Sequence, residues 1–380
     1  MSCPSPFANI PEPRLETLNA LQALFANDPA PEKANLMIGV YRDDRGNPVL
    51  LNSVKRARRI LYDNPSWTHE YPSSHLGECG YRDLSTALFF SSDSHLIKKK
   101  RRKTQYYMLT WTKANHANVF HHVGLETESL PWFSNKTRSL DIEALVARIA
   151  SLPSGSVIVL QTAGNNPTGC DPTPSDWRRL AEWFIAGNHL VFFDAAYPGF
   201  VSGDFERDCE PVRSFAEAGV PMLLASTYGK AFGLYGERVG MLFATTDSAE
   251  HTRRVEGHMK LLARAETGAQ PSFGASLVQA ILGNADLRRI WEQDLMRMAT
   301  ELQSRRHILL EKLYKLDSKK DWSFIKHQAG MFTYTGLDAK QIDRLKNEHH
   351  VYLQDTGRLS IAGLNSTNID HVAKSLHAVT

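Results

Sequence analysis

The chain has 380 residues, of which 42% are hydrophobic and 22% are charged, and its net charge is +3. This composition suits one large core with a smaller domain, and the charge is too small to indicate a nucleic-acid surface. The cysteines have neither CxxC nor metal-ligand spacing, and no apolar run is long enough to cross a bilayer. We therefore expect a cytoplasmic protein with no bound metal and no membrane or nucleic-acid partner.

An alternating pattern of strands and helices begins near residue 155. Continuous apolar strands are expected at 156–161, 189–194, 220–226 and 238–245. A helix is expected at 175–187, and its buried face is predicted to hold Trp177, Leu180, Ala181 and Phe184. Apolar strands separated by helices indicate an α/β fold with a mostly parallel sheet covered on both faces.

Polar side chains follow the ends of three of these strands. Asn166, Asp194 and Lys230 each lie at or just after a strand end. Ligands of open parallel sheets bind at the carboxyl ends of the strands. We therefore expect three segments that are distant in sequence to meet in one site.

The C-terminal part has a different pattern. A long helical region is expected at about 273–315, followed by short strands at 331–336, 351–354 and 358–363. A last helix is predicted to present Ile369, Val372, Ala373 and Leu376 on one side. Helices grouped with a few short strands predict a separate α+β domain, to which the N-terminal segment also contributes.

Lys230 stands in STYGKAFGLYGERVG (226–240), among small, aromatic and apolar residues. Such a lysine is either solvated at a loop tip or held in a pocket, where desolvation lowers the pKa and makes the amine nucleophilic. Asp194, in DAAYPGF, is either a helix N-cap or a carboxylate that holds a protonated ring nitrogen beside Tyr197. Thr227 and Arg238 suit a phosphate, although Arg238 could instead pair with Glu237.

The motifs NNPTG, DAAYPGF, STYGKAFGLYGERVG, GMFTYTGL and GRLSIAGLN, in this order, resemble the aspartate aminotransferase group of class I pyridoxal-phosphate-dependent aminotransferases. The resemblance extends from about residue 7 to the C-terminus. It implies a large cofactor-binding domain with a mostly parallel, seven-stranded sheet (46–296) and a small α+β domain built from both chain ends (1–45 and 297–380). The implied reaction is transamination between aspartate or glutamate and 2-oxo acids, with pyridoxal 5'-phosphate as cofactor.

The resemblance also implies a role for each matching residue. Lys230 would carry the cofactor and shuttle the proton, and Asp194 would hold the ring nitrogen. The remaining implied contacts are Tyr197 and Asn166 to the ring hydroxyl, Thr227 and Arg238 to the phosphate, Arg358 to the substrate α-carboxylate, Gly39 over the substrate and Arg264 to the distal carboxylate. Arg264 and Tyr71 would come from the neighbouring subunit, which implies a homodimer with shared sites.

The resemblance is interrupted between about residues 96 and 116. A strand-helix-strand unit takes roughly 30 residues, and this stretch is too short to hold the one that relatives have, with its phosphate-binding loop. Trp111, matched to the residue that stacks on the cofactor, lies two residues too far from Asn115 and His116. The basic run 98–103 is a solvated replacement loop, a product of incorrect splicing or gene modelling, or a nucleic-acid patch.

Two alternatives to the aspartate reading follow. The chain could be an aminotransferase for another, aromatic amino acid. ETGAQPS after Arg264 departs from the pattern of the group, in the part that would support this arginine. The chain could also be a catalytically impaired dimeric relative, because the shortened stretch removes backbone amides that would bind the phosphate.

Overall fold

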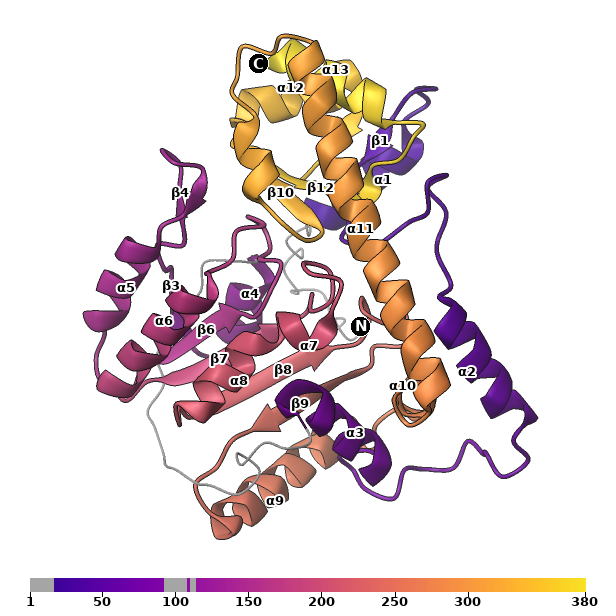
Figure 1. Cartoon of the computed structure of the whole chain (residues 1–380), viewed down its shortest axis with the longest axis vertical. Helices are drawn as coiled ribbons and strands as arrows, with labels where there is room; N and C mark the ends of the chain where they lie inside the picture. Colours follow the sequence, from indigo (N-terminus) through magenta and orange to yellow (C-terminus); the bar gives the residue numbers. More distant parts are fainter. Residues whose placement is uncertain (1–16, 92–107, 110–113) are drawn as a thin grey trace, which may run out of the picture.

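The computed structural model describes residues 17–91, 108–109 and 114–380. In Figure 1 the lower part holds a sheet with helices on both faces, and the upper part brings the indigo N-terminal and the yellow C-terminal segments together. The long helix α11 (Ala285–Lys315) runs through both parts. The predicted boundary between residues 296 and 297 falls inside this helix, so those domain limits stay a prediction.

The central sheet has six strands among the described residues, in the order β3-β2-β6-β7-β8-β9. Their bounds are Met108–Leu109 (β2), Thr127–Glu128 (β3), Val157–Gln161 (β6), Leu190–Ala195 (β7), Met222–Thr227 (β8) and Gly240–Ala244 (β9). All neighbours pair in parallel except β8 and β9. The mostly parallel sheet is confirmed. The described part supplies six strands where the resemblance implies seven, and residues 92–107, in the shortened stretch, lie outside it.

Both faces of the sheet are covered because side chains of β7 alternate between them. Phe193 packs against Trp177 of α6 (Pro174–Ala186) and Phe215 of α8 (Glu210–Glu217). Phe192 contacts Phe120 of α4 (Ala114–His122) on the opposite face. The helix predicted at 175–187 and its four buried residues are confirmed.

The lower part is completed by short elements around the sheet. These are α2 (Asn52–Asp63), α3 (Cys79–Phe90), α5 (Ile142–Ala150), α7 (Phe205–Asp208), α10 (Phe273–Leu282) and the hairpin of β4 (Phe133–Ser134) and β5 (Ser139–Leu140). Both α2 and α10 pack against α11. The helical region predicted at 273–315 is two helices, because Asn284 caps the start of α11 by accepting the Leu287 N–H.

The upper part is an α+β unit built from both chain ends. It contains α1 (Thr17–Asn27), α12 (Ala339–His349), α13 (Ile369–Val379) and the 3-10 turn Ser323–His327. Parallel β1 (Ala34–Asn35) and β11 (Val351–Tyr352) join the two ends, and antiparallel β10 (Phe332–Tyr334) and β12 (Arg358–Ser360) lie beside them. The strand predicted at 358–363 ends at Ser360, and Ile361–Gly363 form a 3-10 turn.

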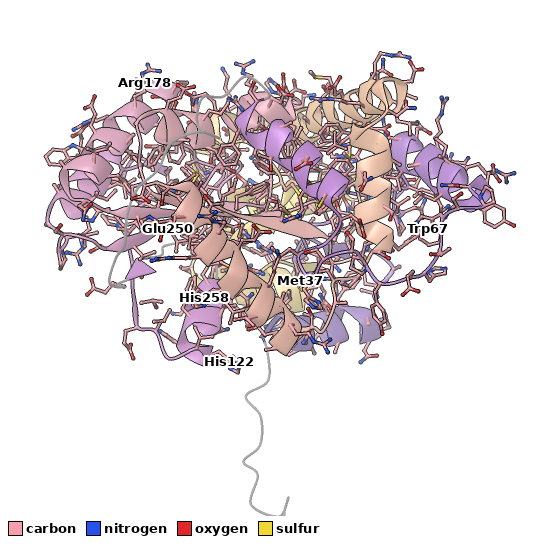
Figure 2. The ribbon with its side chains drawn as sticks, turned by 90° about the horizontal axis from the view of Figure 1, so that it is seen from below. Met37, Trp67, His122, Arg178, Glu250 and His258 are labelled. Atoms are coloured by element: carbon pink, nitrogen blue, oxygen red, sulfur yellow. The ribbon has the colours of Figure 1, made fainter. Side chains whose placement is uncertain are left out.

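Helix α9 (Ala249–Glu266) has no buried residue. Seen from below in Figure 2, it crosses the outside of the molecule, with Glu250 near its start and His258 further along. Leu261 and Leu262, on the same helix, are 68% and 55% exposed. Among the helices of the described ranges, none has the length and apolar character needed to cross a bilayer.

Candidate active site

The expected convergence at the strand ends is present. Asp194, near the end of β7, is in register with Gln161 of β6 and Ala225 of β8. The Asn166 Nδ2 atom lies 3.3 Å from the Tyr197 hydroxyl. The Lys230 Nζ atom lies 5.4 Å from the centroid of the Tyr197 ring. Loops that follow three neighbouring strands therefore place an amide, a phenol and an amine together.

The loop that carries Asn166 is held by two polar side chains, those of Gln161 and Asp171. Gln161 donates from Nε2 to the Asn166 carbonyl (3.0 Å) and accepts the Asn166 N–H (2.9 Å). The Asp171 carboxylate accepts the N–H groups of Gly164 (2.6 Å) and Asn165 (2.9 Å). Part of Asp171 is exposed to solvent, but its carboxyl group is buried, and desolvation raises the pKa of this group to about 6. These bonds fix the direction of the Asn166 amide.

Arg358 is the buried cation of this group, with 7% of its surface exposed. Its Nη1 donates to Asn166 Oδ1 (2.9 Å), and its Nη2 donates to the Met37 carbonyl. Burial lowers the pKa of Arg358 to about 10, so the guanidinium remains charged at neutral pH. Its Nε is buried and makes no hydrogen bond with the described residues. A buried guanidinium with an unused donor is suited to bind a carboxylate.

Phe332 is the packing base beneath these groups. Its ring lies 4.2 Å from the Arg358 guanidinium and meets the Tyr197 ring edge-on at 5.4 Å between centroids. A Cβ atom added to Gly39 would lie 2.5 Å from Cζ of Phe332, which is only 1% exposed. Because the buried ring cannot move aside, only glycine fits at position 39.

Asp194 lies within β7, which rules out the alternative role of a helix N-cap. Its Oδ2 is 3.0 Å from Nε2 of His116, and the two side chains are 19% and 16% exposed. His116, on α4, was not among the predicted site residues. The sequence feature that could have predicted His116 is the stretch WTKANH (111–116). Because Trp111 is displaced in it, the stretch was interpreted as a weakened motif, and its histidine was not assigned to the site.

Thr227 and Arg238 each bond to backbone groups of the stretch that carries Lys230. The Thr227 hydroxyl accepts the Gly229 N–H at 3.1 Å and lies 3.4 Å from the Val239 carbonyl, so it stabilises the turn before Lys230. Arg238 is exposed and donates from Nη1 to the Tyr235 carbonyl at 3.1 Å. Among the ion pairs of the described residues, none joins Arg238 to Glu237, contrary to the alternative surface pairing.

The residues expected from a neighbouring subunit lie on the outside of the chain. Tyr71 is 79% exposed, and Arg264 is exposed near the end of α9. Trp111 and the basic run 98–103 fall outside the described residues. The chain therefore assembles one interior cluster, and the two residues predicted to complete it remain apart from it.

Comparison with known proteins shows the family of the chain. Residues 31–376 match the family described as "Aminotransferase class I and II". The chain belongs to this family. Aspartate aminotransferases are similar over nearly the whole chain: the mitochondrial enzyme of Dictyostelium discoideum is 36% identical (98% of this chain, 93% of the relative). Aspartate aminotransferase 1 of Medicago sativa is also 36% identical (100% of this chain, 96% of the relative).

Solved structures place this aminotransferase in the same fold. The cytoplasmic aspartate aminotransferase of Saccharomyces cerevisiae superposes with a TM-score of 0.94 at 31% identity, covering 99% of this chain and 98% of that one. An aromatic-amino-acid aminotransferase of Burkholderia pseudomallei, covalently bound to pyridoxal phosphate, gives 0.92 at 31% identity, covering 99% of each chain. The predicted family, fold class and transaminase activity are confirmed.

Proposed function

We propose that this aminotransferase exchanges amino and oxo groups between aspartate or glutamate and their 2-oxo acids, with pyridoxal 5'-phosphate as cofactor. The observation that carries the proposal is the buried Arg358 bound to Asn166, beside Tyr197 and Lys230. A carboxylate-binding cation within reach of an amine and a phenol is what an α-amino acid substrate requires. Bound pyridoxal phosphate supplies a ring that accepts electrons from the substrate α-carbon.

The donor set of the interior cluster fits this cofactor. Asp194, contacted by His116, would hold the protonated ring nitrogen, and Tyr197 with Asn166 would donate to the ring hydroxyl. Lys230 would carry the cofactor covalently. Thr227 and Arg238 are the proposed phosphate ligands in the described part of the chain. Arg238 donates one Nη1 bond to the Tyr235 carbonyl, which leaves its other N–H donors for a phosphate.

The residues of the chain then divide the work of the reaction. Arg358 binds the α-carboxylate in a two-pronged geometry through its unused Nε and a neighbouring nitrogen. Gly39, held against Phe332, gives the backbone close access to the substrate. The Lys230 amine would be the base that moves the α-proton of the substrate, and a base must lie within hydrogen-bond reach of the proton that it moves.

We propose a homodimer in which Arg264 and Tyr71 complete the site of the partner subunit. Arg264 is a donor for the distal carboxylate of a dicarboxylic substrate, and it lies on a helix with no buried residue. Leu261 and Leu262 expose apolar surface on the same helix, which a second copy would cover. We also propose a cytoplasmic location, as the names of relatives in rice and yeast give for those proteins. Fractionation of cells that express the natural gene tests the location.

Lys230→Ala tests the assignment of the cofactor. Purified protein mixed with pyridoxal phosphate should show a visible absorption band that aspartate bleaches, and Lys230→Ala should lack it. The matched control is Lys260→Ala, which removes a 46% exposed amine from α9 and should leave the band intact. Borohydride reduction followed by peptide mapping should recover the cofactor on Lys230. Recovery on another side chain contradicts the assignment.

The same assay separates the alternatives. Bleaching by phenylalanine but not by aspartate would establish an aromatic aminotransferase. Turnover that appears only at high cofactor concentration indicates a weakened phosphate site, whereas no turnover at any concentration indicates a catalytically impaired relative. Sequencing the transcript across codons 90–120 decides whether the shortened stretch is genuine.

A further inference from the structure

The segment 36–44 links the upper part of the molecule to the candidate site. At its start, Leu36 donates its N–H to the Tyr352 carbonyl (2.8 Å) and accepts the Ser360 N–H (2.9 Å). In its middle, the Met37 carbonyl accepts from Arg358 and Gly39 lies on the Phe332 ring. The position of this stretch therefore sets the position of one acceptor of Arg358.

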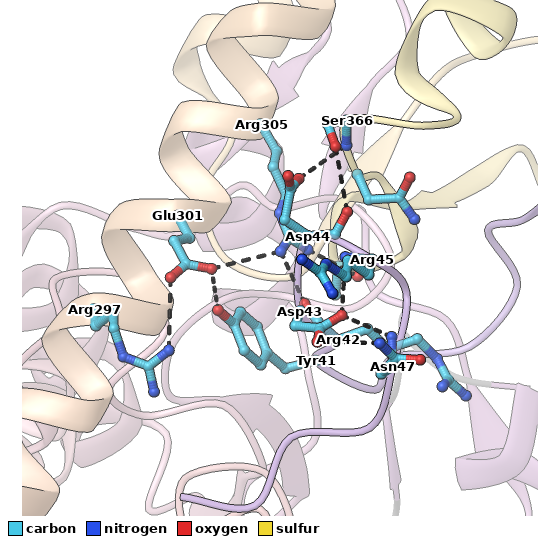
Figure 3. A network of polar contacts seen from close by, with 12 residues as sticks. Tyr41, Arg42, Asp43, Asp44, Arg45, Asn47, Arg297, Glu301, Arg305 and Ser366 are labelled. Carbon is cyan, nitrogen blue, oxygen red and sulfur yellow. Dashed lines mark hydrogen bonds and ion pairs between the residues drawn. The ribbon is translucent and has the colours of Figure 1, made fainter.

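The end of the segment is fixed by Tyr41, which is 2% exposed. Its N–H donates to the Tyr235 hydroxyl at 2.9 Å. Tyr235 belongs to the stretch that carries Lys230, five residues earlier in the chain. The Tyr41 hydroxyl donates to Glu301 of α11. Figure 3 shows the bond between Tyr41 and Glu301. Tyr41 thus connects the lysine-bearing stretch to the long helix.

Glu301 is itself fixed by arginines of α11. Arg305 and Arg297 approach its two carboxylate oxygens at 3.5 Å and 3.6 Å (Figure 3). Arg305 is 6% exposed and also donates to the carbonyls of Arg42 (2.8 Å) and Ala362 (3.1 Å). Burial and the nearby Glu301 carboxylate raise the pKa of Tyr41, so the phenol stays protonated and keeps donating at neutral and moderately alkaline pH.

We propose that Tyr41, held by Glu301, is a positioning residue for the substrate carboxylate. It fixes the segment 36–44 between Arg358 on one side and the Lys230 stretch on the other. Loss of either Tyr41 bond lets the segment shift relative to Tyr235, and Met37 and Gly39 shift with it. Since the Met37 carbonyl is an acceptor of Arg358, a shift of the segment changes how Arg358 is held for the substrate carboxylate, which KM measures. The inference rests on the proposed function.

Tyr41→Phe tests the proposal because it removes one oxygen atom and leaves the ring. The KM for aspartate should rise about fivefold to tenfold, which is less than the loss of a direct bond to the substrate carboxylate would cause, while kcat changes less than about twofold. Hydrogen exchange of the Gly39 and Tyr41 amides should accelerate, with the rest of the chain unchanged. Tyr314→Phe is the matched control, because it removes the hydroxyl of a 57% exposed tyrosine on α11, the helix that carries Glu301.

A second variant keeps the test decisive if Tyr41→Phe folds poorly. Glu301→Ala removes the Tyr41 bond together with the pairs to Arg297 and Arg305, so it should raise KM at least as much as Tyr41→Phe. The double variant should not exceed Glu301→Ala by more than about twofold, because the Tyr41 bond is already lost there. Additive effects, or a KM within about twofold of wild type in an active Tyr41→Phe enzyme, would overturn the positioning role. An inactive wild type would instead contradict the proposed function. Hydrogen exchange then still tests the positioning role, because unchanged exchange of the Gly39 and Tyr41 amides in Tyr41→Phe would show that the hydroxyl does not fix the segment 36–44.

Discussion

The interior cluster (Arg358, Asn166 and Tyr197) and the exposed pair (Tyr71 and Arg264) differ in whether contacts within one chain fix their side chains. Arg358, Asn166 and Tyr197 are each at most 7% exposed and are joined by hydrogen bonds within the chain. Tyr71 is 79% exposed and Arg264 lies on a helix without a buried residue. Burial demands partners for polar groups, so the interior residues are already fixed by one another. Exposed residues carry no such demand and stay available for a second subunit.

This difference predicts two kinds of mutational effect. A change in the interior cluster should lower both activity and stability, because each side chain there satisfies its neighbours as well as the substrate. A change in the exposed pair should lower activity alone. The proposed shared site therefore has one half that is part of the core and one half that is not.

Arg358→Gln should have the largest effect. Loss of the cation removes the α-carboxylate ligand, and kcat/KM for aspartate should fall about 30-fold to 5,000-fold, from 2–5 kcal/mol at a buried charged contact. The urea midpoint should also fall, because Asn166 Oδ1 and the Met37 carbonyl lose their donor. Steady-state kinetics and urea unfolding measure the two effects. Arg344→Gln, at an exposed arginine paired with Glu348, is the control and should change neither.

Arg264→Gln should have a smaller and more selective effect. A charge-assisted hydrogen bond contributes about 1.5–3 kcal/mol, so kcat/KM for aspartate should fall about 10-fold to 100-fold. The rate with phenylalanine and the urea midpoint should change little. Arg254→Gln is the matched control, at a 68% exposed position on the same helix. An equal loss with both substrates would contradict a distal-carboxylate role for Arg264.

Mixed dimers show whether the site is shared. Subunits with Lys230→Ala and subunits with Arg264→Gln are each expected to be nearly inactive on aspartate. When the two are refolded together, a mixed dimer holds one site with Lys230 from one subunit and Arg264 from the other. Activity should reappear in the mixture. Activity that stays at the level of the separate variants would place Lys230 and Arg264 in the same subunit's site.

The sequence predicted the interior cluster because short sequence patterns mark the strand ends that carry it. Strand ends at Gln161, Asp194 and Thr227 are marked by apolar runs that stop at polar residues, and parallel strands bring such ends to one edge. The register of β6, β7 and β8 then follows from their shared burial. The family resemblance predicted site residues of the upper part, such as Arg358. No pattern in the strands of the large sheet predicts them.

Other features depend on tertiary contacts that no local pattern reports. His116 meets Asp194 only because α4 packs across the sheet face opposite α6 and α8. The side-chain direction of Arg238 depends on a positive φ of 52° and a bond to Tyr235. The network of Tyr41 joins residues more than 190 positions apart. The periodicity of apolar residues does not predict such polar contacts between distant segments.

Asp171 offers the smallest and sharpest test of how the interior half is held. Its pKa of about 6 in the folded chain exceeds the ordinary value of 3.8, mainly through desolvation. The folded state therefore binds the proton more tightly, and stability should rise as pH falls from about 6 towards about 4 and be flat above about 7. Asp171→Asn removes this dependence, so wild type should gain stability relative to the variant between pH 7.5 and pH 5. Asp286→Asn, at an 87% exposed side chain, is the control in the same urea titrations. A difference that does not change with pH would mean that Asp171 has an ordinary pKa in the folded chain, and that desolvation of its carboxyl group does not outweigh the bonds from Gly164 and Asn165.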